Sequence, residues 1–150
     1  MALTPTGYDE APYTTEDTIS MAAAYPTNTY RVNFDNKAST GRLDSIEALK
    51  QTIYCILTTE RCRYPIYSTD YGVELQDLIG QPVNTVTLAK MQETITEALT
   101  QDDRISYVRD FEYRIIDDKA LSIRFSVGTA LGEVESALTW WGDRWEVKNV

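Results

Sequence analysis

The chain has 150 residues, of which 43% are hydrophobic and 25% are charged, a composition typical of one compact domain with its own core. Fourteen lysines and arginines against 23 aspartates and glutamates give a net charge of −9, which repels nucleic-acid phosphates and anionic membrane surfaces. We therefore expect neither nucleic acid nor a membrane as a partner.

The first 28 residues are expected to form an extended arm, with residues 29–150 as the folded domain. The arm has three prolines, four acids and no lysine or arginine. Two interpretations stand: a disordered leader, or a segment that orders against a partner through Tyr8, Tyr13 and Tyr25. The arm lacks the basic and apolar stretches of a secretion signal, so we expect synthesis and residence in the cytoplasm.

Residues 29–34 alternate like a short strand, and residues 35–37 and 39–41 carry turn-forming side chains. An amphipathic helix is predicted from Asp44 to about Glu60, where Asp44 and Glu47 have the spacing of a capping box. The apolar residues of this helix share one face, which we expect in the core: Ile46, Leu49, Ile53, Ile56 and Leu57.

Two further helices are predicted after an extended segment at residues 64–67. A short helix at residues 73–79 should end at Gly80. A second long amphipathic helix at residues 85–100 should be capped by Asn84 or Thr85. Its apolar face carries Leu88, Met91, Ile95 and Leu99.

The hydrophobic period changes to two after residue 103, which predicts antiparallel strands. Residues 105–115 should place their odd positions on one face, and residues 117–119 should form a hairpin turn. The return strand should point Leu121, Ile123, Phe125 and Val127 into the core. A third strand covers residues 134–141, and residues 142–147 form either a further strand or a tail.

The sequence thus predicts an α+β domain. Two long helices and one short helix should pack on a three- to four-stranded antiparallel sheet.

Candidate chemistry is sparse, because the sequence contains no histidine, the usual general base and the commonest metal ligand. Cys55 and Cys62 are expected to be reduced thiols and are too few for a zinc site. Paired carboxylates suffice for a glycosidase, and the candidates are Glu60, Asp70, Glu74 and Asp77. Their spacing does not require them to converge, so we expect no catalytic, metal or cofactor site.

Three segments carry a more specific signal: LDSIEALKQTIY at residues 43–54, ILTTER at 56–61 and IYSTDYGVELQDLIG at 66–80. In this order they resemble the baseplate wedge proteins of PBSX-type contractile phage tails, which belong to the wider group of sheath initiators. The resemblance extends upstream to residues 29–32 and downstream to Gly132. It does not cover the arm or the tryptophan-containing end of the chain.

The resemblance implies a structural protein of the virion, located in the tail baseplate and assembled in the cytoplasm of the bacterial host. Such a protein links the hub or tube to the wedge and initiates sheath assembly. Its implied partners are other wedge and hub proteins, the sheath protein and the tail tube. The alternative is a tail-associated, lysozyme-like glycoside hydrolase that uses Glu60 with Asp70 as its carboxylate pair.

A structural motif is expected where the first long helix ends. Glu60 and Arg61 lie at the helix exit, and Arg61 should pair with Glu74 or Asp77 and so lock the turn at Tyr71 and Gly72. Gly72 should take a positive φ. Tyr67, in the Ile-Tyr-Ser segment, completes the motif.

A candidate interface is expected on the third strand. If nothing in the chain covers residues 134–141, their free edge can accept a strand of the sheath protein by β-augmentation. Thr139 lies on this edge, and Trp140, Trp141 and Trp145 are candidate anchors. For the tryptophans, core packing is an equal alternative.

Overall fold

The computed structural model describes residues 26–117, 120–141 and 144–149, so the arm residues Tyr8, Tyr13 and Tyr25 lie outside it, as do two residues of the expected turn at 117–119. The elements in chain order are β1 (Thr29–Asn33), β2 (Ala38–Leu43), α2 (Ser45–Thr58), the 3-10 turn η1 (Gln76–Leu78), α3 (Thr85–Thr100), β3 (Ile105–Asp117), β4 (Ala120–Thr129), β5 (Gly132–Trp140) and β6 (Trp145–Asn149). This confirms the α+β class. No helix in these ranges is long and apolar enough to cross a membrane.

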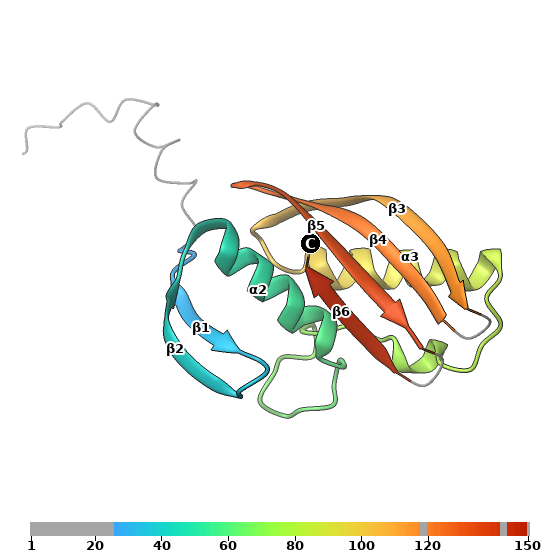
Figure 1. Ribbon diagram of the computed structural model, residues 1–150, viewed down its shortest axis with the longest axis horizontal. Helices are drawn as coiled ribbons and strands as arrows, with labels where there is room; N and C mark the ends of the chain where they lie inside the picture. Colours follow the sequence, from blue (N-terminus) through green and yellow to red (C-terminus); the bar gives the residue numbers. More distant parts are fainter. Residues whose placement is uncertain (1–25, 118–119, 142–143, 150) are drawn as a thin grey trace, which may run out of the picture.

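The strands form two antiparallel sheets (Figure 1). One is the hairpin of β1 and β2; the other has four strands in the order β3-β4-β5-β6. Helix α3 contacts β3, and α2 contacts β5 and β6, so the two helices divide the sheet between them.

The core lies between these helices and the four-stranded sheet. On β4 the expected facing is confirmed, because Leu121, Ile123, Phe125 and Val127 are each at most 2% exposed. The helices contribute the following buried residues: Leu49, Ile53, Ile56 and Leu57 from α2, and Met91, Ile95 and Leu99 from α3.

Both long helices begin at the expected caps. The Asn84 side chain accepts the Thr87 N–H at 2.8 Å, as predicted for α3. At α2 the capping box is wrong in detail: Asp44 accepts the N–H of Ser45, and Glu47 pairs with Lys50 at 3.2 Å. Glu47 thus pairs with the next turn of α2, and the cap is formed by Asp44 together with Thr27, whose Oγ1 also accepts the Ser45 N–H at 3.1 Å.

The expected short helix at residues 73–79 is wrong except for the turn η1. Val73 is extended instead, because its N–H donates to Thr59 O at 2.9 Å and its carbonyl accepts the Arg61 N–H. Only Gln76–Leu78 forms a helical turn, and it is followed by a turn at Ile79 and Gly80, where Gly80 has φ +82°.

Residues 39–41 were expected in a turn but lie within β2. The ladder with β1 shifts its register between Tyr30 and Val32, and Gly41 has φ +74° there. The turn-forming residues therefore form a bulge within β2 and do not end the strand.

Strand β3 does not keep one alternation along its length. The register with β4 shifts between Arg109 and Glu112, and Asp110 has φ +57° at this bulge. A further shift lies between Ile105 and Tyr107, so the core-facing position is odd at Ile105, even at Val108 and odd again at Tyr113. The prediction that all odd positions share a face is wrong for this reason.

Strand β5 is an interior strand, which overturns the expected free edge. It pairs with β4 along its whole length and with β6 from Ser136 to Trp140. Of the two interpretations of residues 142–147, the further strand is confirmed for Trp145–Asn149, while residues 142 and 143 lie outside the described ranges. Thr139 lies between Ser122 and Glu146, so a proline there would break an interior ladder.

Candidate functional site

The candidate site is the segment at residues 59–75, which leaves the end of α2 and returns to it. A parallel bridge between Glu60 and Val73 closes the segment at its base. The expected motif residues therefore lie together, beside the C-terminal end of α2.

Arg61 joins this segment to α3. Its Nε donates to the carbonyl oxygen of Gly72 at 3.3 Å, and its Nη1 lies 3.1 Å from Glu97 Oε1 and 3.9 Å from Glu74 Oε1. The Arg61 side chain is only 13% exposed, whereas Glu74 and Glu97 are 55% and 57% exposed, so solvent screens the acidic side of these pairs. We call Arg61, Gly72, Glu74 and Glu97 the Arg61 clamp.

The expected partner Glu74 is thus present, but the closer acid, Glu97, was missed. Glu97 lies on α3, 36 positions away along the chain, and on the exposed side of that helix. Its place in the helical pattern is that of any solvated acid. Only the packing of α3 brings it to Arg61.

The Glu60 carboxyl accepts hydrogen bonds from the backbone at the start of η1. Burial raises the pKa of its carboxyl, while hydrogen bonds from the N–H groups of Gln76 and Leu75 act in the opposite direction. These donors lie where η1 begins, so the Glu60 side chain satisfies N–H groups that the short turn leaves without partners.

Gly72 has φ +100°, as expected. A Cβ at this position would lie 2.6 Å from Thr59 O and 3.2 Å from Arg61 N. Glycine is therefore required both by the backbone conformation and by the close approach of the two chain segments.

Tyrosines form the outer part of the segment. The rings of Tyr67 and Tyr71 stack with centroids 4.6 Å apart, and burial raises the pKa of Tyr71 to about 12. Tyr64, Ile66 and Tyr67 are 49%, 84% and 44% exposed. The segment thus presents an apolar tip on a base held by the Arg61 clamp.

The carboxylates of the hydrolase alternative do not line the same hollow at Asp70. Asp70 lines a hollow with Asp102, whereas Glu60 is not among the residues that line it. Asp102 is in turn held by Arg104, whose Nη2 lies 2.6 Å away. In the described part of the chain, no group of three histidine, cysteine, aspartate or glutamate residues is placed to hold a metal ion. Both cysteines are free thiols, as expected.

The expected aromatic interface is mostly internal. Thr139 and Trp140 are 9% and 6% exposed, and the Trp140 ring stacks on Trp145 at 5.8 Å. Trp145 Nε1 also donates to Leu75 O at 3.4 Å, which joins β6 to the candidate site. Only Trp141 is exposed, at 41%, with its indole N–H donating to Glu146.

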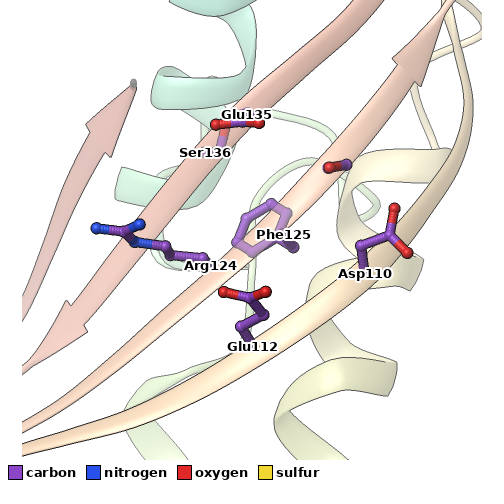
Figure 2. A pocket seen from close by; sticks show the side chains of 7 residues that line it. Asp110, Glu112, Arg124, Phe125, Glu135 and Ser136 are labelled. Carbon is purple, nitrogen blue, oxygen red and sulfur yellow. The ribbon is translucent and has the colours of Figure 1, made fainter.

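The open face of the four-stranded sheet has a hollow at the β3 bulge (Figure 2). It is lined by Asp110, Glu112, Arg124, Phe125, Ser126, Glu135 and Ser136. Figure 2 shows carboxylates and one guanidinium around its rim. This mixture of charges is typical of a solvated sheet face and does not single out a ligand.

The substitution Arg61→Lys should lower the free energy of unfolding by about 1–2 kcal/mol, because an ammonium cannot bond Gly72 and Glu97 with the fixed geometry of a guanidinium. Urea unfolding measures this. Arg63→Lys, at an exposed position, is the matched control and should change stability by less than about 0.5 kcal/mol. Equal effects would mean that the Arg61 clamp contributes nothing to stability.

Glu60 should also give a pH dependence with a definite sign. Its pKa in the folded chain is above the ordinary value of 4.5, so the folded state binds this proton more tightly than the unfolded state. Its contribution to stability is greatest below pH 4.5 and declines as the pH rises through the raised pKa. Glutamine at this position does not titrate. The free energy of unfolding of Glu60→Gln, measured by urea titration, should therefore rise relative to that of the wild type as the pH increases from 4.5 through the raised pKa. A difference between the two proteins that does not change with pH would contradict this.

Comparison with known proteins gives two matches. The model of the family described as contractile injection system sheath initiator matches residues 21–132, which include the whole candidate site and end where β5 begins. The phage-like element PBSX protein XkdS of Bacillus subtilis (strain 168) is 42% identical over 110 residues, which cover 71% of this chain and 77% of that protein.

Proposed function

The chain belongs to the contractile injection system sheath initiator family, and we propose on this basis that it is the baseplate protein on which the first ring of the contractile sheath is laid. The single observation that carries the proposal is the family match over residues 21–132, supported by the 42% identity to the PBSX protein. The role is structural, within the tail of a virion or tail-like particle.

We assign contact with wedge and hub proteins to the segment at residues 59–75. Its apolar tip, Tyr64, Ile66 and Tyr67, is exposed, while the Arg61 clamp fixes its base. Exposed aromatic side chains on a rigid support lose little conformational freedom when they bind, which favours a permanent interface. We propose that the same segment also contacts the tail tube.

The sheath contact is assigned to β6 in place of β5. The outer edge of β6 has no strand partner in the described ranges, and the exposed Trp141 lies in the connection between β5 and β6. A strand of the sheath protein added there would extend the four-stranded sheet through main-chain hydrogen bonds. We keep the proposed division of the chain into an arm at residues 1–28 and a domain at residues 29–150. We also propose that the particle is assembled in the cytoplasm of the host.

Sheath assembly on purified baseplates tests the proposed function. Baseplates made without this protein should support tube growth but no sheath, and addition of the wild-type chain should restore a sheath of normal length. Sheath that assembles normally without the chain would contradict the proposal.

We also propose that the chain has no catalytic role. Glu60 holds backbone N–H groups and does not line the hollow that contains Asp70, which gives the hydrolase alternative no support. A turbidity assay on purified peptidoglycan checks this. Lysis by the wild type that Glu60→Gln abolishes would restore the alternative.

A further inference from the structure

The β1–β2 hairpin is basic in an acidic chain. Between residues 26 and 43 it carries Arg31, Lys37 and Arg42 against one acid, Asp35, while the whole chain has a net charge of −9. All three basic side chains are exposed, and none forms an ion pair with an acid of the described ranges. The hairpin therefore carries positive charge that no described acid neutralises.

The same hairpin exposes large apolar side chains. Tyr30, Val32 and Phe34 are 66%, 37% and 43% exposed. The Arg42 guanidinium lies 5.4 Å from the centre of the Tyr30 ring, so cationic and aromatic groups share one surface. Strand β1 contacts α2, and the hairpin lies on the side of α2 away from the four-stranded sheet (Figure 1). A two-stranded sheet is marginally stable in water, so a cover over these side chains would stabilise the hairpin.

Residues 1–25, which we call the acidic segment, have the complementary character. They contain four acids and three tyrosines but no lysine or arginine: Asp9, Glu10, Glu16, Asp17, Tyr8, Tyr13 and Tyr25. Carboxylates pair with guanidinium and ammonium groups, and tyrosine rings pack on apolar and cationic side chains. The family match begins at residue 21, so all four acids lie outside it.

The described chain begins beside the hairpin. The Thr27 hydroxyl donates to the Asp44 carboxylate and accepts the Ser45 N–H at 3.1 Å, which fixes this point at the junction of β2 and α2. The far end of the hairpin, at Lys37, is one strand length away, roughly 20 Å. About ten residues of extended chain span about 35 Å. The acidic segment is therefore long enough to reach every basic side chain of the hairpin.

We propose that the acidic segment folds back over the β1–β2 hairpin of its own chain and shields it before assembly. Its carboxylates pair with Arg31, Lys37 and Arg42, and its tyrosines cover the exposed aromatic side chains. Attachment beside the hairpin gives the segment an effective concentration on the order of millimolar, so weak contacts suffice. The segment keeps the hairpin from contacts with other proteins until it is displaced. This inference goes beyond the sheath role and does not depend on it.

Carbodiimide cross-linking of the full-length chain tests this position, because the reagent joins a carboxylate to a lysine amine in contact with it. Lys37 is the one lysine of the hairpin, and Lys90, exposed on α3, is the matched control. Mass spectrometry of chymotryptic digests should find the acids of the segment joined to Lys37 at least about tenfold more often than to Lys90. Added salt should lower the yield at Lys37, because exposed charges are screened.

An equal mixture of unlabelled and heavy-nitrogen-labelled chains distinguishes a chain's own segment from that of a neighbour. The cross-links to Lys37 should join fragments that carry the same label. Cross-links between labelled and unlabelled fragments would mean that the segment binds a second copy of the chain.

A charge reversal separates local pairing from net charge. Arg31→Glu leaves Lys37 in place and should lower its cross-link yield about threefold, because one attractive contact becomes repulsive. Arg114→Glu, at an exposed position of β3, changes the net charge equally and should leave the yield unchanged.

Three results would overturn the inference. They are equal yields at Lys37 and Lys90, cross-links between differently labelled chains, and equal yields in Arg31→Glu and Arg114→Glu. None of them bears on sheath assembly, so a failure here is distinguishable from a failure of the proposed function.

Discussion

Replacement of Gly72 by alanine should lower the free energy of unfolding by about 3 kcal/mol, since it combines a strained φ with a steric clash. At φ +100° a non-glycine residue is disfavoured, and the new Cβ would lie 2.6 Å from Thr59 O. Neither the Thr59 carbonyl nor the Arg61 N–H can move without breaking the bridge to Val73. Thermal unfolding should show a decrease in Tm of roughly 6–12 °C.

Gly80 provides the matched control. It also has a positive φ, +82°, but nothing lies within 4 Å of the position that a Cβ would take. Gly80→Ala should therefore cost about 1 kcal/mol, the conformational term alone. If the two alanine variants were equally stable, the contact between the two segments at Gly72 would not be tight.

The substitution Phe125→Ala should destabilise the chain by about 3–5 kcal/mol, because it leaves a cavity in the core that its neighbours cannot fill. Phe125 is 2% exposed, and its ring stacks on Phe111 at 5.3 Å beside the β3 bulge. Urea unfolding followed by circular dichroism measures the change.

Ser122→Ala, on the same strand but the opposite face, should change stability by less than about 0.5 kcal/mol. A loss at Ser122 comparable with that at Phe125 would mean that the open face of the sheet is covered. The two variants together report which face of β4 is packed.

The elements that sequence analysis predicts well are those whose pattern and partners are local. The bounds of α3 and the facing of β4 follow from regular periods of apolar residues with a capping or turn residue at the end. The positive φ of Gly72 follows from the preference of glycine for such turns. In each case neighbouring residues determine the conformation.

The predictions are wrong where contacts with a segment distant in the sequence determine the conformation. The sequence around Val73 predicts a helix, yet hydrogen bonds to the backbone of Thr59 and Arg61 hold Val73 in an extended conformation. The hydrophobic pattern of β3 conceals the bulge at Asp110, because one extra residue reverses the alternation without changing composition. Likewise Glu97 resembles any helix-surface acid until packing brings it to Arg61.

The position of β6 has a consequence for how the chain folds during synthesis. Helix α2 is among the first elements to leave the ribosome, but β6, which packs against it, is the last of the described elements to do so. Until residues 145–149 emerge, part of the apolar face of α2 lacks its cover, and Leu75 lacks the bond from Trp145. The nascent chain therefore completes this part of its core only after residues 145–149 have emerged, and a product that stops before β6 lacks a finished fold to incorporate into a particle.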